Sequence, residues 1–220
     1  MRNKIATICA LLAPLGLFSA TCQASVETTV GAEFWNVKTK VNEVDRDRAA
    51  TGSYYASIEH EVKYLPDMRV RYSSVDADYM AFDKLDLTLY FNLLEHDLMH
   101  FDAGITFSDL SNTKYLNVAD LAAGESSFDE MIWAWYGYGE INVPKTNFDV
   151  IGEMNFGNNK GIKSTDLMAG MQYRLPFEGS EVALRAGYRA IDLEADAFAS
   201  SLGKSFIFAH GWFLGAQYRF

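Results

Sequence analysis

The C-terminal segment, residues 205–220, alternates strictly enough to constrain the fold of the whole chain. Its even positions are apolar or aromatic except for His210. Its odd positions, which include Gly211, Gln217 and Arg219, are mostly smaller or more polar. Side chains of a β-strand point alternately to opposite faces, so one face suits hydrocarbon and the other suits a polar interior. This two-residue period is typical of a strand in a transmembrane β-barrel.

Nine further segments alternate in the same way, so the sequence predicts ten strands. In one of them Leu85, Leu87 and Leu89 share a face, while Asp86 and Thr88 share the other. Single-chain bacterial barrels have an even number of strands, which this count satisfies. The predicted fold class is therefore all-β, a closed antiparallel up-and-down transmembrane β-barrel. The ten segments are roughly 26–37, 53–64, 68–75, 82–93, 98–108, 128–142, 147–156, 162–174, 181–191 and 205–220.

The predicted connections differ between the two ends of the strands. Those at one end are short and contain Pro66, Pro144 and Pro176. Proline cannot donate a hydrogen bond to a sheet, so it is excluded from central strands. Barrels of this kind have short turns in the periplasm and longer loops outside, and an even strand count places both chain ends in the periplasm. The connections at the other end are mostly longer and polar, notably 38–52, 109–127 and 192–204.

Residues 1–24 are predicted to be a cleaved signal peptide, which leaves residues 25–220 as a single barrel domain. Arg2 and Lys4 precede an apolar run that is shorter than the roughly 20 residues of a spanning helix and ends in small residues. Lipid modification of Cys22 is an alternative. Cleavage would remove both cysteines and change the net charge from −10 to −12. The mature chain would then have no thiol chemistry, and its acidity argues against nucleic-acid binding.

Aromatic residues gather near the ends of the predicted strands. Rings with one apolar and one polar edge prefer the level of the lipid headgroups, so we expect two interfacial girdles. The alternative is the aromatic core of a soluble β-protein. The residues concerned are Trp35, Tyr54, Tyr64, Tyr72, Trp133, Tyr173, Tyr188, Trp212 and Tyr218.

The inward faces hold most of the ionisable residues, and we expect these residues to pair. A ten-stranded barrel is only slightly wider than an eight-stranded one, whose interior is filled by side chains. Buried charge is tolerated when hydrogen-bonded partners surround it. A selective permeation path is the alternative to such a structural network. The predicted pairs are Arg174 with Glu181, Asp166 with Arg189, and Glu61 with Arg71.

The sequence offers few residues for catalysis or metal binding. His60 and His210 are predicted to face outward, His96 lies in a turn, and His100 points inward two residues before Asp102. No Gly-x-Ser-x-Gly motif is present, and the histidines are too dispersed to predict a zinc site. We therefore predict a protein that is not an enzyme, with no catalytic residue, metal site or cofactor and with an unassigned binding site. The pairs Asp45 with Asp47 and Asp76 with Asp78 could at most hold Ca²⁺ weakly or bridge cations to lipopolysaccharide.

Four stretches of the chain resemble a family of small, uncharacterised outer-membrane β-barrel proteins of Gram-negative bacteria. The resemblance implies the same fold and an outer-membrane location, and it brings no assigned activity. The terminal Tyr-x-Phe also resembles the C-terminal strand that the barrel assembly machinery recognises, here ending in Phe220. The four stretches are Tyr54–His60 running to Leu65-Pro66, Leu85–Phe91, Ala186–Arg189 and Tyr218–Phe220.

These observations together predict an integral outer-membrane protein with a charged and largely occluded lumen. Its expected role is that of an envelope or surface protein. Its expected partners are outer-membrane lipid, lipopolysaccharide and the barrel assembly machinery. Two alternatives stay open, a narrow channel for small solutes and a soluble periplasmic binder of the lipocalin type.

Overall fold

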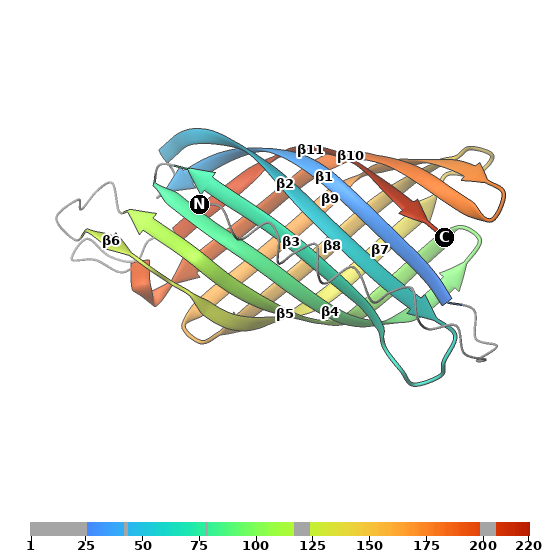
Figure 1. Ribbon diagram of the computed structural model, residues 1–220, viewed down its shortest axis with the longest axis horizontal. Coiled ribbons are helices and arrows are strands. Elements are labelled where there is room, and N and C mark those ends of the chain that lie inside the picture. The colour runs from blue at the N-terminus through green and yellow to red at the C-terminus, as the bar shows by residue number, and fades with distance from the viewer. Residues whose placement is uncertain (1–25, 42–43, 78, 117–123, 199–205) are drawn as a thin grey trace, which may run out of the picture.

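The computed structural model describes residues 26–41, 44–77, 79–116, 124–198 and 206–220. The predicted signal peptide lies outside these ranges. Within them the chain forms ten long antiparallel strands, together with the two-residue strand β6 and the short 3-10 helix η3 (Figure 1). The elements are β1 (Val26–Val41), β2 (Val44–His60), β3 (Asp67–Ala77), β4 (Met80–His96), β5 (Met99–Leu116), β6 (Glu125–Ser126), β7 (Glu130–Asn142), β8 (Phe148–Asn159), β9 (Ile162–Phe177), β10 (Ser180–Ala195), η3 (Asp196–Phe198) and β11 (Phe206–Arg219).

The sheet closes on itself because the first and last strands pair. β1 pairs with β11 from Thr29 opposite Arg219 to Val41 opposite Ile207, and β4 pairs with β5. Phe220 exchanges two backbone hydrogen bonds of 2.9 Å with Thr28, so the ladder continues to the last residue. Each long strand therefore has two neighbours, and the predicted closed antiparallel barrel is confirmed.

The outer face of the barrel carries a belt of exposed apolar side chains. The predicted alternation is confirmed in the C-terminal strand, where Trp212 and Leu214 are 70% and 64% exposed while Gly211 and Phe213 are buried. Trp133 and Trp135 of β7 also face outward. A closed sheet with an apolar exterior is how strands cross a bilayer. The protein is thus an integral barrel of the outer-membrane type. Among the described residues no helix is long and apolar enough to cross a membrane.

Several strands run further toward the outer rim than predicted. Residues 38–41 continue β1 and residues 44–52 belong to β2, so the predicted long loop 38–52 is wrong. β5 likewise continues to Leu116 and β10 to Ala195. In these extensions the alternation of apolar and polar residues is inverted. Apolar residues face the lumen, and polar residues face outward. A polar outward residue is expected where a barrel wall rises above the hydrocarbon into water, and the sequence prediction mistook such residues for loop.

The inverted pattern is clearest on β10. Ile191, Leu193 and Ala195 are buried in the lumen, while Asp192 and Glu194 lie on the outer surface. On the same rim, β8 and β9 are joined by a two-residue turn whose φ angles are 54° at Lys160 and 74° at Gly161. Two successive positive φ angles are the signature of a tight hairpin that follows the twist of the strands.

Smaller corrections concern the periplasmic rim and the aromatic residues. β2 ends at His60, so Glu61 lies exposed in the turn 61–66 rather than in the lumen. Pro176 lies at the end of β9, opposite Glu181, rather than in the turn. Trp35 is buried inside the barrel and does not belong to an interfacial girdle. Odd residues of β1 point inward, so the strand period places Trp35 there.

Candidate functional site: the lumen

The outer end of the lumen holds a cluster of buried apolar side chains, here called the apolar plug. Phe198 of η3 stacks on Tyr115 with ring centroids 4.3 Å apart and meets Phe128 edge-on at 4.9 Å. All three rings are buried, so η3, which follows β10, adds the Phe198 ring to this cluster. Below them the plug consists of strand residues, including Val37, Val41, Val75, Met80, Phe82, Leu110, Ile132, Ile191, Leu193 and Ile207.

An ionic layer lies next to the apolar plug. Arg189 binds both oxygens of Asp166, with Nε donating at 2.9 Å and Nη2 at 2.7 Å. Lys84 donates to Asp166 at 3.1 Å and to Asp86 at 2.6 Å. Ser108 donates to the second oxygen of Asp86 at 2.6 Å. All of these side chains are buried, so the layer is a hydrogen-bonded network with little access to water.

Two further clusters continue the network toward the periplasm. Arg71 binds Glu153 with two hydrogen bonds of 2.8 and 3.1 Å, and Arg69 approaches the same carboxylate at 2.8 Å. Arg185 donates to Glu33 at 2.9 Å and also to the Tyr55 hydroxyl. In these clusters each buried charge has an oppositely charged partner within hydrogen-bond distance.

The predicted ion pairs are partly confirmed. Asp166 and Arg189 do bind each other, although Asp166 lies directly opposite Ile191 and the contact is diagonal. The pairing of Arg174 with Glu181 is wrong, since Arg174 contacts Asp149 at 2.8 Å. The register is shifted by two residues, so that Arg174 lies opposite Ala183, and the turn pairs Phe177 with Ser180.

The predicted pair of Glu61 with Arg71 is also wrong. Arg71 reaches Glu153 on β8, across the lumen rather than across the Pro66 turn. Neither the register of a hairpin nor the two-residue period of a strand predicts that contact. It depends on the tilt and stagger with which the sheet closes.

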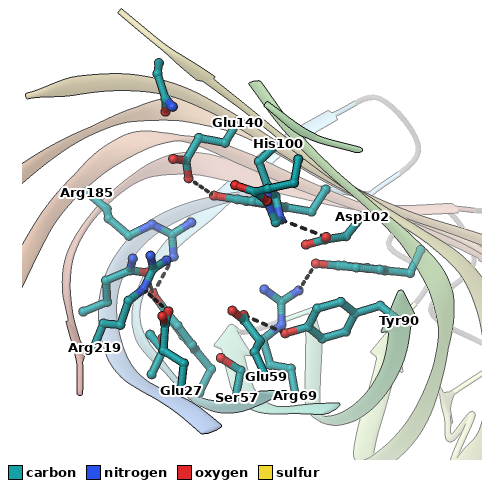
Figure 2. A pocket seen from close by; sticks show the side chains of 17 residues that line it. Glu27, Ser57, Glu59, Arg69, Tyr90, His100, Asp102, Glu140, Arg185 and Arg219 are labelled. Carbon is teal, nitrogen blue, oxygen red and sulfur yellow. Dashed lines mark hydrogen bonds and ion pairs between the residues drawn. The ribbon is translucent and has the colours of Figure 1, made fainter. Parts of the chain in front are cut away.

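The periplasmic end of the lumen is an open vestibule with a volume of about 310 Å³ (Figure 2). It lies at the rim where β1 begins, β11 ends and the short turns are found. β6 lies at the opposite rim (Figure 1). The buried ionic network forms its floor. The lining side chains come from β1, β2, β3, β4, β5, β7, β10 and β11, and they include Glu27, Tyr55, Glu59, Arg69, Tyr90, Glu95, His100, Asp102, Tyr136, Tyr138, Glu140, Arg185 and Arg219.

Two carboxylates of the vestibule are held by neutral donors. Glu59 accepts a hydrogen bond of 2.9 Å from the Tyr90 hydroxyl. Glu140 accepts one of 2.9 Å from the Tyr138 hydroxyl and another of 2.9 Å from the amide of Gln172. These donors fix the carboxylate oxygens in place without neutralising their charge.

His100 bridges two carboxylates at the mouth of the vestibule. Its Nε2 lies 2.8 Å from Asp102, and its Nδ1 contacts Glu95. The sequence prediction that His100 faces inward near Asp102 is confirmed. Both ring nitrogens face acceptors, so the doubly protonated ring satisfies both contacts. Both ring nitrogens are therefore engaged by carboxylates.

The remaining histidines and acidic pairs do not gather at a common site. His60 lies at the end of β2, 3.6 Å from Asp67, and His96 ends β4. His210 contacts Tyr188 on the outer surface. Asp78 and the side chains of Asp45 and Asp47 lie outside the described residues. Among those described, no group of three or more histidine or acidic residues could hold a metal ion.

The sequence prediction missed the vestibule as a distinct site. Four of its carboxylates lie at inward positions, whereas Glu95 follows the register shift between Asn92 and Leu94 of β4. The strand period does not indicate which inward residues pair. The tyrosines were a usable signal, because Tyr55, Tyr90, Tyr136 and Tyr138 all fall at inward positions. An inward tyrosine in a charged lumen needs a polar partner for its hydroxyl, which predicts a carboxylate nearby.

Comparison with known proteins reveals only distant similarity. No protein-family model matches the chain, and no curated protein matches its sequence. Among solved structures, the β domain of the Bordetella autotransporter BrkA aligns over 88% of this chain and 98% of its own, at 12% identity and a TM-score of 0.43. Neisserial surface protein A gives 12% identity and a TM-score of 0.37, over 88% and 97%.

The toluene transporter TodX of Pseudomonas putida aligns over 88% of this chain and 89% of its own, at 8% identity and a TM-score of 0.37. At such identities and scores, we draw no functional inference from any of the three similarities. The assignment as an outer-membrane barrel is instead based on the closed sheet and the apolar exterior.

Proposed function

We propose that this protein is a non-conducting and non-enzymatic barrel of the outer-membrane envelope. The observation that carries the proposal is the order of layers in the lumen, where the apolar plug closes the outer end directly above the ionic network. An ion that crossed would have to leave water, separate buried pairs such as Arg189 with Asp166, and then pass stacked aromatic rings. Each step carries a desolvation cost.

The proposal includes the processing and partners expected from the sequence. A signal peptide of residues 1–24 would direct export, and the barrel assembly machinery would engage the strand that ends at Phe220. The chain would then belong with the small outer-membrane barrel proteins that its sequence resembles. Outer-membrane lipid and lipopolysaccharide would contact the apolar belt and the outer rim.

Conductance in a planar bilayer tests the closed lumen directly. The purified barrel, inserted at low density in 1 M KCl, should give no discrete current steps. A narrow channel is the alternative outcome, and reproducible unitary steps from protein free of other porins would establish it.

Cysteine labelling provides a second measurement that does not depend on insertion into a bilayer. Leu193→Cys places a thiol in the apolar plug, and Glu194→Cys places one on the outer surface at the next residue. A small charged thiol reagent should modify position 194 rapidly and position 193 at least about a hundredfold more slowly, because buried thiols are inert. Similar rates at both positions would show that water reaches the plug.

A further inference from the structure

We infer that the periplasmic vestibule binds a small organic cation with two primary ammonium groups, such as a short linear diamine. The site lies below the buried ionic network and opens toward the periplasm. Binding there does not require a conducting lumen, so the inference goes beyond the role proposed above.

The cavity is lined by more carboxylates than guanidinium groups. Five carboxylates and three guanidinium groups face it. Each guanidinium is already committed, since Arg69 pairs with Glu153, Arg185 with Glu33 and Arg219 with Glu27, at 2.8 to 2.9 Å. Asp102 and Glu95 share His100.

Glu59 and Glu140 therefore stand apart from the other carboxylates of the vestibule. Among the described residues, no Lys, Arg or His forms an ion pair with either of them. Their hydrogen bonds come from the hydroxyls of Tyr90 and Tyr138 and from the amide of Gln172. Arg219, which pairs with Glu27, acts on both carboxylates only from beyond contact distance, so their charge is partly compensated and a bound cation would relieve the remaining cost.

Glu59 and Glu140 come from strands that are not neighbours in the sheet. Glu59 lies on β2 and Glu140 on β7, and these strands stand on different sides of the barrel. In the view of Figure 2 the two side chains lie on opposite sides of the cavity. Within the described part of the chain no three acidic or histidine ligands converge, so a single metal ion does not fit. A linear molecule with an ammonium group at each end could contact two carboxylates on opposite sides of one cavity.

Aromatic rings form part of the cavity wall. Tyr55 and Tyr136 line the cavity, and each already has a guanidinium over its ring, with Arg185 5.5 Å from the Tyr55 centroid and Arg69 5.1 Å from that of Tyr136. Arg71 also lies over the Tyr55 ring, 5.3 Å from its centroid. Because guanidinium groups already lie over these rings, the rings would offer a ligand their apolar carbons, which suit a methylene chain.

Two deeply buried side chains also face the cavity with unsatisfied atoms. Arg185 is 2% exposed and Asp102 is 4% exposed, and both line the vestibule. Among the described residues Arg185 Nε has no hydrogen-bond partner, and Asp102 Oδ1 has its ion pair with His100 at 2.8 Å. Because Arg185 Nε and an ammonium group are both donors, a water molecule beside the bound cation would complete Arg185, while Asp102 Oδ1 can accept a further hydrogen bond.

Calorimetric titration of the full barrel in detergent micelles at pH 7 and low salt tests this site. The probes are four small molecules with chains of four carbons, namely 1,4-diaminobutane, butylamine, 4-aminobutanoate and butanedioate. We expect the diamine to bind most tightly, with a Kd below about 1 mM. Butylamine should bind at least about tenfold more weakly, and the dicarboxylate should not bind.

Two variants locate the binding. Glu59→Gln and Glu140→Gln should each weaken diamine binding by about tenfold, because each removes one charged contact. Glu178→Gln, in the exposed turn after β9, removes the same charge outside the vestibule and should leave the affinity unchanged. A heat-dependent gel shift confirms that each variant is folded.

Three results would overturn the inference. They are a diamine that fails to bind, a zwitterion or dicarboxylate that binds as tightly as the diamine, and an affinity that Glu178→Gln lowers as much as the vestibule variants do. The outcome is separable from the proposed closed lumen. A barrel that conducts and still binds the diamine would overturn only the earlier proposal, and a silent barrel without binding would overturn only this one.

Discussion

The outer and the periplasmic parts of the lumen are built from opposite kinds of residue, although the same strands line both. Along β10 the inward side chains Arg185 and Arg189 give way to Ile191 and Leu193, and all four are at most 2% exposed. The outward face changes in the opposite sense, from Leu184 and its apolar neighbours to Asp192 and Glu194.

The difference teaches that the medium outside the wall determines which residues are available inside it. Where the wall faces hydrocarbon, the outward positions must be apolar, and the alternate positions take the charges. Where the wall stands in water, the outward positions are polar, and the alternate positions form an apolar core of the soluble type. The two parts of the lumen should therefore respond differently to substitution.

Arg189→Ala should have the largest effect. It removes the bidentate partner of the buried Asp166 and leaves that carboxylate with Lys84 alone as a cation, and removing one member of a buried pair typically costs about 3–5 kcal/mol. The measurement is the free energy of unfolding in urea, for barrels folded into lipid vesicles. Lys163→Ala breaks an exposed contact of 3.8 Å with Glu194 and should cost less than about 1 kcal/mol. Equal losses in both variants would contradict the buried network.

Ile191→Ala tests the apolar side of the comparison at the next inward position. Truncating a buried isoleucine typically costs about 2–5 kcal/mol, because apolar contacts are lost and a cavity forms. Ile191→Leu should cost less than about 1.5 kcal/mol, since it conserves volume. The same unfolding assay applies. A loss below about 0.5 kcal/mol for the alanine variant would mean that the plug is loosely packed.

The double variant Asp166→Leu with Arg189→Met asks whether the ionic layer is needed for stability. Replacing a buried pair by apolar residues of similar volume is often neutral or stabilising, so most of the loss caused by Arg189→Ala should disappear. Because Lys84 would still have Asp86 as a partner at 2.6 Å, it should remain satisfied. A double variant as unstable as Arg189→Ala would show that the ionic layer itself is required.

The comparison also explains which features the sequence could predict. The ten strands and the direction of their side chains follow from the two-residue period, which holds both in the bilayer and above it. Leu87 and Leu184 lie outside and Asp86 and Arg185 inside, as predicted. The lengths of the outer loops were predicted wrongly because the alternation of apolar and polar residues is inverted above the bilayer. There Lys38 and Asp192 belong to strands and point outward.

Partners in the lumen were predictable only where a hairpin brings them together. Asp166 with Arg189 was found in this way, even though the assumed turn was displaced by two residues. Arg71 with Glu153 joins strands from different sides of the barrel, 82 residues apart in sequence. Such a pair is determined by strand tilt and stagger, which no local pattern records.

The smallest expected effect lies at the outer rim, where polar contacts are exposed to water. Asp129, between β6 and β7, accepts hydrogen bonds from the hydroxyl of Thr113 at 2.6 Å and from its backbone N–H at 2.9 Å. These bonds stabilise the charged form and lower the pKa of the Asp129 carboxyl below its usual value. The folded protein therefore binds this proton less readily than the unfolded chain does.

The stability contributed by Asp129 should be complete above the pKa of the unfolded chain, about 3.9, and should be lost as pH falls through the lower folded pKa. Asp129→Asn should therefore lower the urea midpoint slightly at pH 7, and the difference from wild type should shrink as the pH approaches 3. Asp97→Asn changes an exposed turn carboxylate whose oxygens accept no hydrogen bond among the described contacts, and it is the control for the loss of one surface charge. A difference that stays constant with pH would mean that Asp129 contributes packing rather than charge.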